Sequence, residues 1–595
     1  MRKRLKGDSR TPPPWENWRE RLSKSWTPLA VCSLALVVYS RSLFCGFIRD
    51  DLPQIVHNPQ VQSWQYLPQI LTLHLWNHIP QFQALFYRPL FSLWMLVIDT
   101  IGGLSPWFWH LSSVLLHAAC TYLVYRLSKR LTGSEVGAGA AAAVFAVHPI
   151  HVEAVTWVSA SNELLFSLLT LWAMIVLLSP RERGDRGPIL FSTLLYFGSL
   201  FAKETGVVLI FLMVALALIR LKDRVGGWGK RFVVASSPYV GGTVAYLIIR
   251  WYVLHGMGVE KGERGWRQAI FTSPSIVLFY LRKLLVPVHL SGAYVNPIYA
   301  SPTTAFWLPA AAILLFVVSM TWLAFRVNPI FGYSAALILL PLLPVLATIR
   351  VYPQGDMTHD RYLYLPSVGL CLLIGIVADR ARHSVRSVRI VAASVLGIVL
   401  ISFSVLTFAQ QRFYDNDITY SQQEIDFNPA NGFPYAMLGN VYMDQGQTDL
   451  ALKNYRMASA RAPDDARISL LLSRGLFAVQ QYTETEAILN RLLLRTDLDA
   501  KRQISVRLSL ANVEIALGNL DSAQQSLQQV EQADPNFPEL HWALGILYKK
   551  RGQIQLAQTA FDKEYQLTGD KEAQQQSDMI TLEMLRTQPD DGLQH

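Results

Sequence analysis

Long apolar runs recur through the first two thirds of the chain and stop near residue 410. Most runs approach 20 residues, which is the length an α-helix needs to cross a hydrocarbon core of roughly 30 Å at about 1.5 Å per residue. The pattern therefore predicts an all-α fold with about 11 membrane spans. The spans are expected at residues 28–45, 107–127, 136–148, 162–179, 188–202, 205–220, 232–254, 303–325, 330–349, 363–379 and 388–409.

The pattern changes after residue 410, where the chain becomes polar and begins to repeat. Leu510 and Leu544, Ala523 and Ala557, and Leu527 and Phe561 are each 34 residues apart. This is the period of the tetratricopeptide repeat (TPR), in which a helix pair buries its apolar face only against its neighbours. An earlier copy contains Tyr435, Leu438, Gly439, Tyr442, Ala451, Tyr455, Ala458 and Pro463, and a degenerate copy lies between them around Phe477 and Ala487.

These two patterns define the expected domain organisation. Residues 1–27 form a basic cytoplasmic N-terminus, and residues 28–410 form a transmembrane domain with external loops. Residues 411–431 are predicted to be a linker, residues 432–570 a TPR α-solenoid, and residues 571–595 a polar tail. TPR solenoids offer a concave surface to peptides and proteins, so protein partners are expected for this part of the chain.

Charge bears on the class of partner and on the orientation. The chain is 51% hydrophobic and only 16% charged, with a net charge of +10, whereas soluble proteins are about 25% charged. A basic chain can indicate nucleic-acid binding, but here the basic residues flank spans, so membrane lipids are the expected partners and nucleic acid is not. Cytoplasmic loops of membrane proteins are rich in Lys and Arg. The N-terminus and the compact basic clusters at 129–130, 181–183, 220–231, 326 and 380–389 are therefore assigned to the cytoplasmic side.

One apolar stretch, residues 273–290, decides the count of spans. Arg282 and Lys283 lie in its middle, and each costs roughly 2.5–3.5 kcal/mol at the centre of a membrane helix. We therefore expect an interfacial or re-entrant helix here. With this assignment, the long segments 46–106, 149–161, 255–302 and 350–362 and the TPR tail all lie on the external face.

Uncommon polar motifs occur in or beside these external segments. The first loop begins with Phe47-Ile48-Arg49-Asp50-Asp51 and contains Tyr87-Arg88-Pro89-Leu90. The others are His148-Pro149-Ile150-His151-Val152-Glu153-Ala154-Val155, Lys203-Glu204, and Asp360-Arg361-Tyr362-Leu363-Tyr364-Leu365-Pro366-Ser367.

The pair of histidines in the second motif also invites a metal interpretation. His148 and His151 would share one face of a helix, with Glu153 as a further ligand for zinc or manganese. Pro149 disfavours a continuous helix here, however, and the sequence offers no fourth ligand. A divalent metal is left open but is not the expectation, and a polar bracket that holds a loop or a sugar is favoured.

Taken in order, these motifs followed by TPRs resemble those of the transmembrane and TPR-containing O-mannosyltransferases and their bacterial relatives. The resemblance covers roughly residues 40–570. It implies the GT-C glycosyltransferase fold and the transfer of a sugar from a polyprenyl-phosphate carrier to Ser or Thr hydroxyls of exported proteins. Two features depart from the family pattern: Asp360 stands where a Glu is usual, and the repeat array is short.

The resemblance also assigns roles to residues. It implies that Asp50 is the general base and that Asp51 orients the acceptor or shares that role. Arg88, Lys203 and Arg361 become candidates for the lipid phosphate. His148, His151, Glu153 and Glu204 complete the expected site as sugar-binding, acceptor-binding or bracketing residues.

Two other functions fit the same sequence. The chain is also interpretable as a non-enzymatic, membrane-anchored TPR scaffold for envelope assembly, or as a GT-C enzyme that acts on a lipid or glycan. A scaffold would need none of the acidic and basic residues that gather on one face. The absence of any Asn-X-Ser/Thr sequon favours a bacterial inner membrane with the TPR array in the periplasm over an endoplasmic-reticulum membrane with the array in the lumen.

Overall fold

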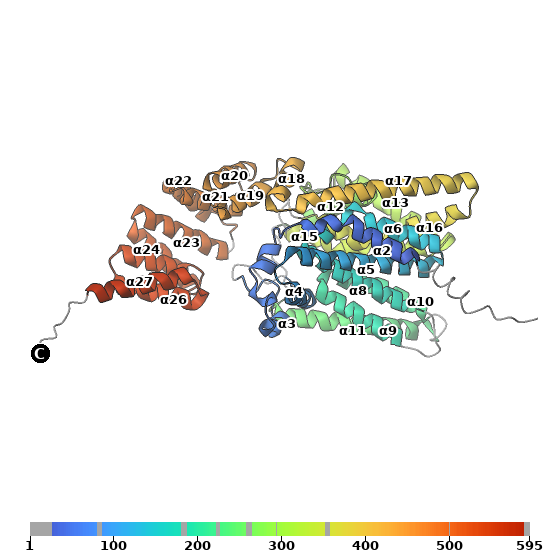
Figure 1. Ribbon diagram of the computed structural model, residues 1–595, viewed down its shortest axis with the longest axis horizontal. Helices are drawn as coiled ribbons and strands as arrows, with labels where there is room; N and C mark the ends of the chain where they lie inside the picture. Colours follow the sequence, from blue (N-terminus) through green and yellow to red (C-terminus); the bar gives the residue numbers. More distant parts are fainter. Residues whose placement is uncertain are drawn as a thin grey trace, which may run out of the picture. The chain divides into compact units, whose positions relative to one another are not determined.

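A computed structural model describes residues 26–79, 86–179, 187–221, 226–256, 264–292, 294–351, 357–498 and 500–587 (Figure 1). Helices dominate these residues, and none of them lies in a β-strand. The chain divides into two compact units, Met1–Phe427 and Asn428–His595. The predicted basic N-terminus lies outside the described residues except for Trp26 and Thr27.

The helices of the first unit run side by side in a bundle (Figure 1). The longer ones are α2 (Trp26–Val38), α5 (Pro106–Thr132), α6 (Glu135–Val147), α8 (Asn162–Leu177), α9 (Gly187–Ala202), α10 (Ile210–Arg220), α11 (Trp228–Val253), α12 (Trp266–Leu285), α13 (Thr304–Arg326), α14 (Ile330–Leu339), α15 (Leu343–Val351), α16 (Tyr364–Arg382) and α17 (Arg386–Gln410). A helix thus occupies every position at which a span was predicted.

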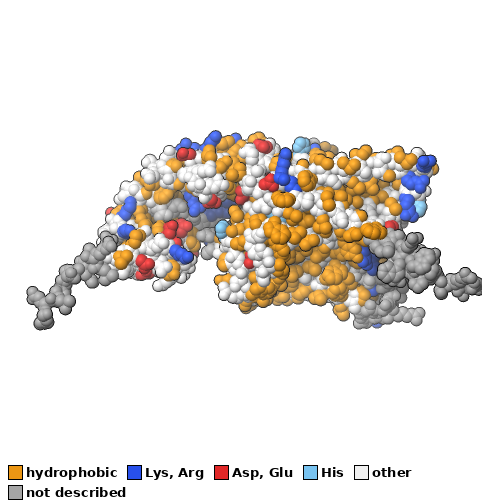
Figure 2. Space-filling view, in the orientation of Figure 1, with side chains coloured by type: hydrophobic (Ala, Val, Ile, Leu, Met, Phe, Trp, Pro, Cys, Tyr) orange, Lys and Arg blue, Asp and Glu red, His pale blue; other side chains and the backbone are white. Residues whose placement is uncertain are grey.

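Seven helical segments within the described residues are long and apolar enough to cross a membrane. An eighth arises if Glu135–Val147 and Pro149–Thr156, which meet at 51°, form one broken span. In α13 and in the segment Arg386–Tyr414, only 6% of the most apolar stretch is buried within the protein. Such wide apolar surfaces require a lipid environment. Figure 2 shows hydrophobic side chains across the visible face of this unit, with basic side chains gathered where α16 and α17 meet.

Two segments refine the sequence-based picture of the loops. Helix α12, which carries Arg282 and Lys283 in its last turn, is not among the seven. The first external segment, expected as a loop over 46–106, contains the apolar helix α4 (Pro89–Gly102). Its 14 residues extend about 21 Å, which is less than the hydrocarbon core. The loop expectation missed this helix because a 14-residue apolar segment falls below the length that signals a span.

The segment predicted as a linker is folded onto the first unit. Residues Gln411–Tyr414 form a 3₁₀ turn, and α18 (Asp417–Phe427) follows. The buried Gln411 side chain accepts a hydrogen bond from the Ser42 amide at 2.8 Å and donates one to the Val38 carbonyl at 2.9 Å. These bonds fix the end of α17 against the end of α2 and bring α18 to the first external loop.

The second unit is a stack of helix pairs, as the 34-residue period predicted. The helices are α19 (Gly432–Asp444), α20 (Thr448–Arg461), α21 (Ala466–Ala478), α22 (Tyr482–Leu493), α23 (Ala500–Leu517), α24 (Leu520–Ala533), α25 (Leu540–Lys550), α26 (Ile554–Thr568) and α27 (Lys571–Thr587). A Cβ atom at Gly545 would lie 2.6 Å from the Phe561 ring, so the helices of this pair approach closely only because the residue is glycine. The tail predicted as polar contains α27, whose Ile580 packs against Phe561.

Candidate active site

Arg49, in the loop that follows α2, ties this loop to α18. Its backbone lies in the left-handed region at φ 50°, and its amide donates to Asp417 at 2.9 Å. Its guanidinium donates to Glu424 at 2.6 Å and lies 5.1 Å from the centre of the Tyr420 ring. A non-glycine residue in this region costs energy, and this set of contacts offsets that cost. Arg49 therefore sets the direction of the two aspartates that follow it.

The structure separates the two aspartates that were expected to act together. Asp51 is completely buried, whereas Asp50 is exposed. The Asp51 carboxylate accepts hydrogen bonds from the Ile48 amide at 3.1 Å, the Ser159 amide at 2.7 Å and the Ser159 hydroxyl at 2.5 Å. Burial raises the pKa of Asp51 to about 7, although the hydrogen bonds from Ser159 and Ile48 oppose the rise. Asp51 thus fastens the loop to residues 158–160, and Asp50 remains accessible.

Each of the three cations proposed for phosphate binding pairs with a glutamate. Arg88, directly before α4, donates from Nε to Oε2 of Glu204 at 2.9 Å and from Nη2 to Oε1 at 2.6 Å. Burial alone would raise the pKa of Glu204, but the charge and hydrogen bonds of Arg88 lower it to about 2. Lys203 pairs with Glu163 at the start of α8. Arg361 pairs with Glu153, whose second oxygen also accepts the Arg361 amide at 2.9 Å.

Aromatic rings bring two of these cations to one place. The Lys203 ammonium lies 4.9 Å from the centre of the Tyr362 ring, and the Arg361 guanidinium lies 5.3 Å from the same centre. Arg361 also lies 4.9 Å from the Trp157 ring. Since Trp157 directly precedes the segment that holds Asp51, this cluster adjoins the first loop. Arg88 is linked to this cluster through its ion pair with Glu204, the residue that follows Lys203.

The exposure of the three cations differs. The side chain of Lys203 is 6% exposed, that of Arg88 12%, and that of Arg361 18%. All three are more buried than is usual for a charged side chain, and burial of a charge is tolerated when an opposite charge and hydrogen bonds are present. Arg361 offers the most accessible surface to a ligand.

The two histidines of the second motif do not converge with Glu153. His148, beside α7 (Val152–Thr156), has Nε2 within 3.1 Å of the Leu284 carbonyl, and its Nδ1 accepts the Ile150 amide at 3.2 Å. His151 Nε2 lies 2.8 Å from the Ser367 hydroxyl. Within the described residues, no group of His, Cys, Asp and Glu has the arrangement of a metal site. His148 contacts α12 and His151 contacts α16, whereas Glu153 pairs with Arg361.

Several residues of the candidate active site were not predicted from the sequence. Glu163, Ser159 and His359 were not singled out, yet Glu163 neutralises Lys203, Ser159 holds Asp51, and His359 Nδ1 lies 3.5 Å from Glu153. Glu163 carried a usable signal, because a carboxylate in the first turn of an apolar span requires a partner. Ser159 and His359 gave no such signal. Asp360, noted only as a departure from the family pattern, is buried and accepts a hydrogen bond from Tyr294 at 2.8 Å.

The fold and this cluster together define a class: a polytopic helical membrane protein with a buried ion-pair cluster at one end of its bundle, joined to a TPR solenoid. The second unit matches the tetratricopeptide-repeat family model over residues 436–501 and a TPR-repeat model over residues 511–552. Beyond the repeats, the chain is similar over 72–90% of its length to proteins named protein O-mannosyl-transferase, which confirms the predicted family resemblance.

Two relatives illustrate the extent of this similarity. A Caenorhabditis elegans protein O-mannosyl-transferase, F38B6.6, is 26% identical over 72% of this chain and 61% of its own length. Human protein O-mannosyl-transferase TMTC3 is 23% identical over 90% of this chain and 64% of its own. The chain therefore spans less than two thirds of these relatives. Among solved structures, an Archaeoglobus fulgidus oligosaccharyltransferase aligns with 65% of this chain and 55% of its own length at 13% identity, with a TM-score of 0.34.

Proposed function

We propose that the chain is a membrane glycosyltransferase that moves a mannose-like hexose from a polyprenyl-phosphate carrier to Ser or Thr hydroxyls of exported proteins. The observation that carries the proposal is the cluster around Tyr362, where Lys203 and Arg361 adjoin the loop that bears Asp50. Relatives named protein O-mannosyl-transferase support the choice of reaction.

The accessible carboxylate of Asp50 suits a general base. In the proposed step it accepts the proton of the acceptor hydroxyl while the hydroxyl oxygen bonds to the anomeric carbon. The bond from that carbon to the phosphate oxygen breaks, and the polyprenyl phosphate leaves with the electron pair. One base and no covalent intermediate suffice for such an inverting displacement. Asp51, whose oxygens already accept three hydrogen bonds, acts as a positioning residue.

Arg361 is the strongest candidate for the leaving phosphate. Its side chain is the most exposed of the three cations at 18%, and a guanidinium presents five N–H donors, which suit phosphate oxygens. The three cations and their three glutamates sum to zero charge, and the phosphate would therefore be held by oriented donors rather than by net positive charge. Arg88 is ranked second and Lys203 third, following their exposed fractions of 12% and 6%.

The basic loops favour a non-cytoplasmic side for the Asp50 loop and the TPR array, which would be the periplasm of a bacterial envelope or, as the alternative, the lumen of the endoplasmic reticulum. On this side exported proteins emerge as extended chains. A TPR solenoid could present such acceptors to the membrane unit.

The test is transfer of mannose from a polyprenyl-phosphate donor to a Ser/Thr-rich peptide by the purified full chain. Asp50→Asn should abolish transfer while the protein remains folded and inserted. Asp426→Asn, which changes another exposed aspartate, on α18, is the matched control and should retain activity. Wild-type turnover by the Asp50→Asn variant would refute the assignment of the base.

A membrane-anchored scaffold remains the second candidate, because ion pairs such as Lys203–Glu163 also occur in purely structural networks. The same assay separates the two functions. If the wild-type chain transfers no sugar from any polyprenyl-phosphate donor while its TPR unit binds envelope proteins, the scaffold is favoured.

A further inference from the structure

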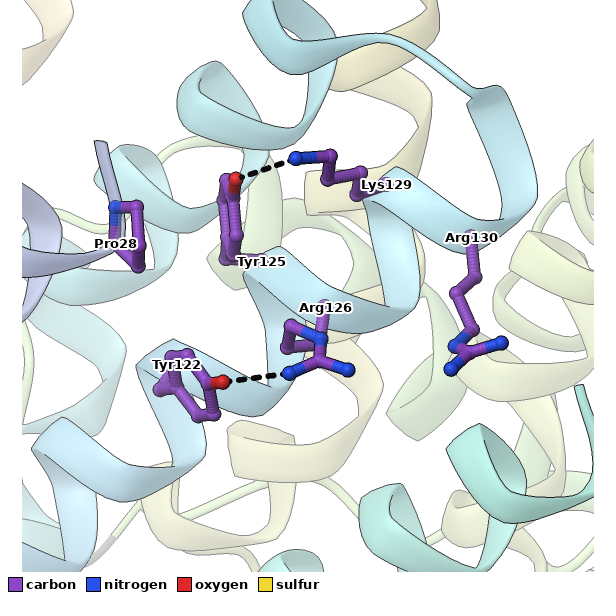
Figure 3. A pocket seen from close by; sticks show the side chains of 6 residues that line it. All are labelled: Pro28, Tyr122, Tyr125, Arg126, Lys129 and Arg130. Atoms are coloured by element: carbon purple, nitrogen blue, oxygen red, sulfur yellow. Dashed lines mark hydrogen bonds between the residues drawn. The ribbon is translucent and has the colours of Figure 1, made fainter. Parts of the chain in front are cut away.

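A second basic site lies at the opposite end of the first unit. A pocket of about 420 Å³ opens beside the end of α5 and the start of α2. Figure 3 shows its lining, which consists of Pro28, Tyr122, Tyr125, Arg126, Lys129 and Arg130. Helix α8 separates this pocket from the candidate active site. Glu163 is in its first turn, and the Leu178 carbonyl at its other end accepts a hydrogen bond from Arg130, about 22 Å away along the helix.

The two guanidiniums of the pocket lack acidic partners among the residues that the structure describes. Arg126 donates to the Tyr122 hydroxyl at 2.6 Å, and Arg130 donates to the Leu178 carbonyl at 3.0 Å. The Nε atom of Arg130 is buried and has no hydrogen-bond partner in the described part of the chain.

The third cation is already neutralised. Lys129 pairs with Glu135 at 2.5 Å, and the same carboxylate accepts a hydrogen bond from the Tyr125 hydroxyl at 2.5 Å. The pocket therefore keeps an excess of positive charge that comes from its two arginines. The helix dipole also favours basic residues in the last turn of α5, but the dipole alone does not account for a pocket lined by two arginines without a described acidic partner.

The surface beside the pocket is suited to lipid. Leu115, Tyr122 and Arg126 follow one another on a single face of α5, at spacings of seven and eleven residues from Leu115. Leu115 is 52% exposed and Tyr122 36% exposed. The order from aliphatic to phenolic to cationic side chain matches the order from acyl chain to interface to phosphate in a bilayer leaflet. Exposed Trp26 and Leu29 flank Pro28 in sequence and extend the apolar surroundings.

We propose that this pocket binds a phosphate-bearing anion, with Arg126 and Arg130 as its principal ligands and the headgroup of an anionic phospholipid as the occupant that the apolar stripe favours. Guanidinium groups bind phosphate oxygens through paired N–H donors, which makes arginine suited to this role. A soluble phosphate would use the same donors, without the contacts along Leu115 and Tyr122.

The test compares lipid binding by three forms of the purified full chain using native mass spectrometry. The forms are the wild type, Arg126→Gln/Arg130→Gln, and Arg326→Gln/Arg389→Gln, a control that removes two exposed arginines from the ends of α13 and α17. Phosphatidylglycerol, phosphatidylcholine and inorganic phosphate are titrated separately. We expect the pocket variant to bind phosphatidylglycerol about 30-fold more weakly, because it loses two phosphate contacts of about 1 kcal/mol each, and the control, whose arginines lie outside the pocket, to bind as the wild type does.

The separate titrations distinguish a phospholipid headgroup from a soluble phosphate as the ligand. Selective loss of phosphatidylglycerol binding in the pocket variant supports a lipid headgroup, whereas loss of inorganic phosphate binding in that variant alone supports a soluble ligand. Equal binding of both probes by all three forms would overturn the proposal. Arg126→Lys/Arg130→Lys, which keeps the charges but loses the fork, should recover part of the binding and shows that a weak result is not due to misfolding.

Discussion

Two groups of three cations lie at opposite ends of the same helical bundle, and they are satisfied in different ways. At the candidate active site each cation has its own glutamate: Arg88 with Glu204, Lys203 with Glu163, and Arg361 with Glu153. In the α5 pocket only Lys129 is paired, with Glu135. Burial accompanies the difference at Lys203, which is buried, whereas Arg126 and Arg130, which have no described acidic partner, are half-buried.

The comparison teaches that basic residues in a membrane protein need not share a role. A buried cation is tolerated only when an opposite charge lies beside it. The primary role of the ion pairs at the candidate active site is therefore to hold the loops and helices in place, and ligand binding is secondary. Cations at the edge of the bundle are hydrated or meet lipid phosphates, so they can remain unpaired until a ligand arrives. Substitutions should therefore have large effects on stability at the first site and small ones at the second.

The largest effect is expected for Lys203→Ala. This change leaves the Glu163 carboxylate buried without its counter-charge, which should lower the free energy of unfolding by about 3–5 kcal/mol. The measurement is the fraction of folded protein that remains after heating in detergent, followed by size-exclusion chromatography.

A double variant separates the loss of charge pairing from the loss of packing. Lys203→Met/Glu163→Gln removes both charges while it keeps most of the volume, and it should be much more stable than Lys203→Ala. If the single and the double variants are equally destabilised, the ion pair is not the source of the effect.

The next effect concerns catalysis at Arg361. Arg361→Lys keeps the charge but loses the planar fork, so transfer should fall, and Arg361→Ala should lower it further. A charge-assisted hydrogen bond of roughly 1.5–3 kcal/mol corresponds to about 10- to 150-fold in rate if it acts only in the transition state. Initial rates of sugar transfer, with protein levels matched, measure this. Unchanged rates in both variants would reduce Arg361 to a structural partner of Glu153.

The sequence predicted the local features of this architecture well and the long-range contacts poorly. Apolar runs located the helices of the first unit, of which seven or eight within the described residues qualify as spans. The period that places Gly545 against Phe561 located the solenoid, because both signals repeat along the chain. The pairing of Glu153 with Arg361 joins residues 208 positions apart, and no local pattern encodes such a pair.

The two aspartates of the first loop show the same limit at shorter range. Asp50 and Asp51 look equivalent in the sequence, and only the donors from Ser159, far along the chain, make one of them buried and structural. The α5 pocket was likewise invisible, since the sequence identified Lys129 and Arg130 only as a basic cluster at a membrane surface.

The stability of the folded protein should depend on pH through Asp51, a buried carboxyl group whose hydrogen-bond donors are neutral groups and not a cation. Because its pKa is raised to about 7 in the folded protein, the folded state binds its proton more tightly than the unfolded state does. Stability is thus fully present below the unfolded pKa and is lost as pH rises toward 7. Between pH 5 and pH 7 the loss should be about 2 kcal/mol. Thermal stability of the wild type and of Asp51→Asn across this range measures it, and an identical pH dependence in both would contradict the assignment.

The smallest effect is expected for Arg126→Gln in lipid-free detergent, and it tests the other half of the comparison. Arg126 has a phenol, and no described carboxylate, as its partner, so its loss should change the unfolding free energy by less than about 0.5 kcal/mol. The unfolding free energies of the wild type and the variant should differ clearly only when a ligand is added. Phosphatidylglycerol at ten times its dissociation constant should stabilise the wild type by about 1.4 kcal/mol, and the variant by much less. A variant that is severely destabilised without lipid would make Arg126 a structural cation like Lys203, and the contrast between the two ends of the bundle would no longer hold.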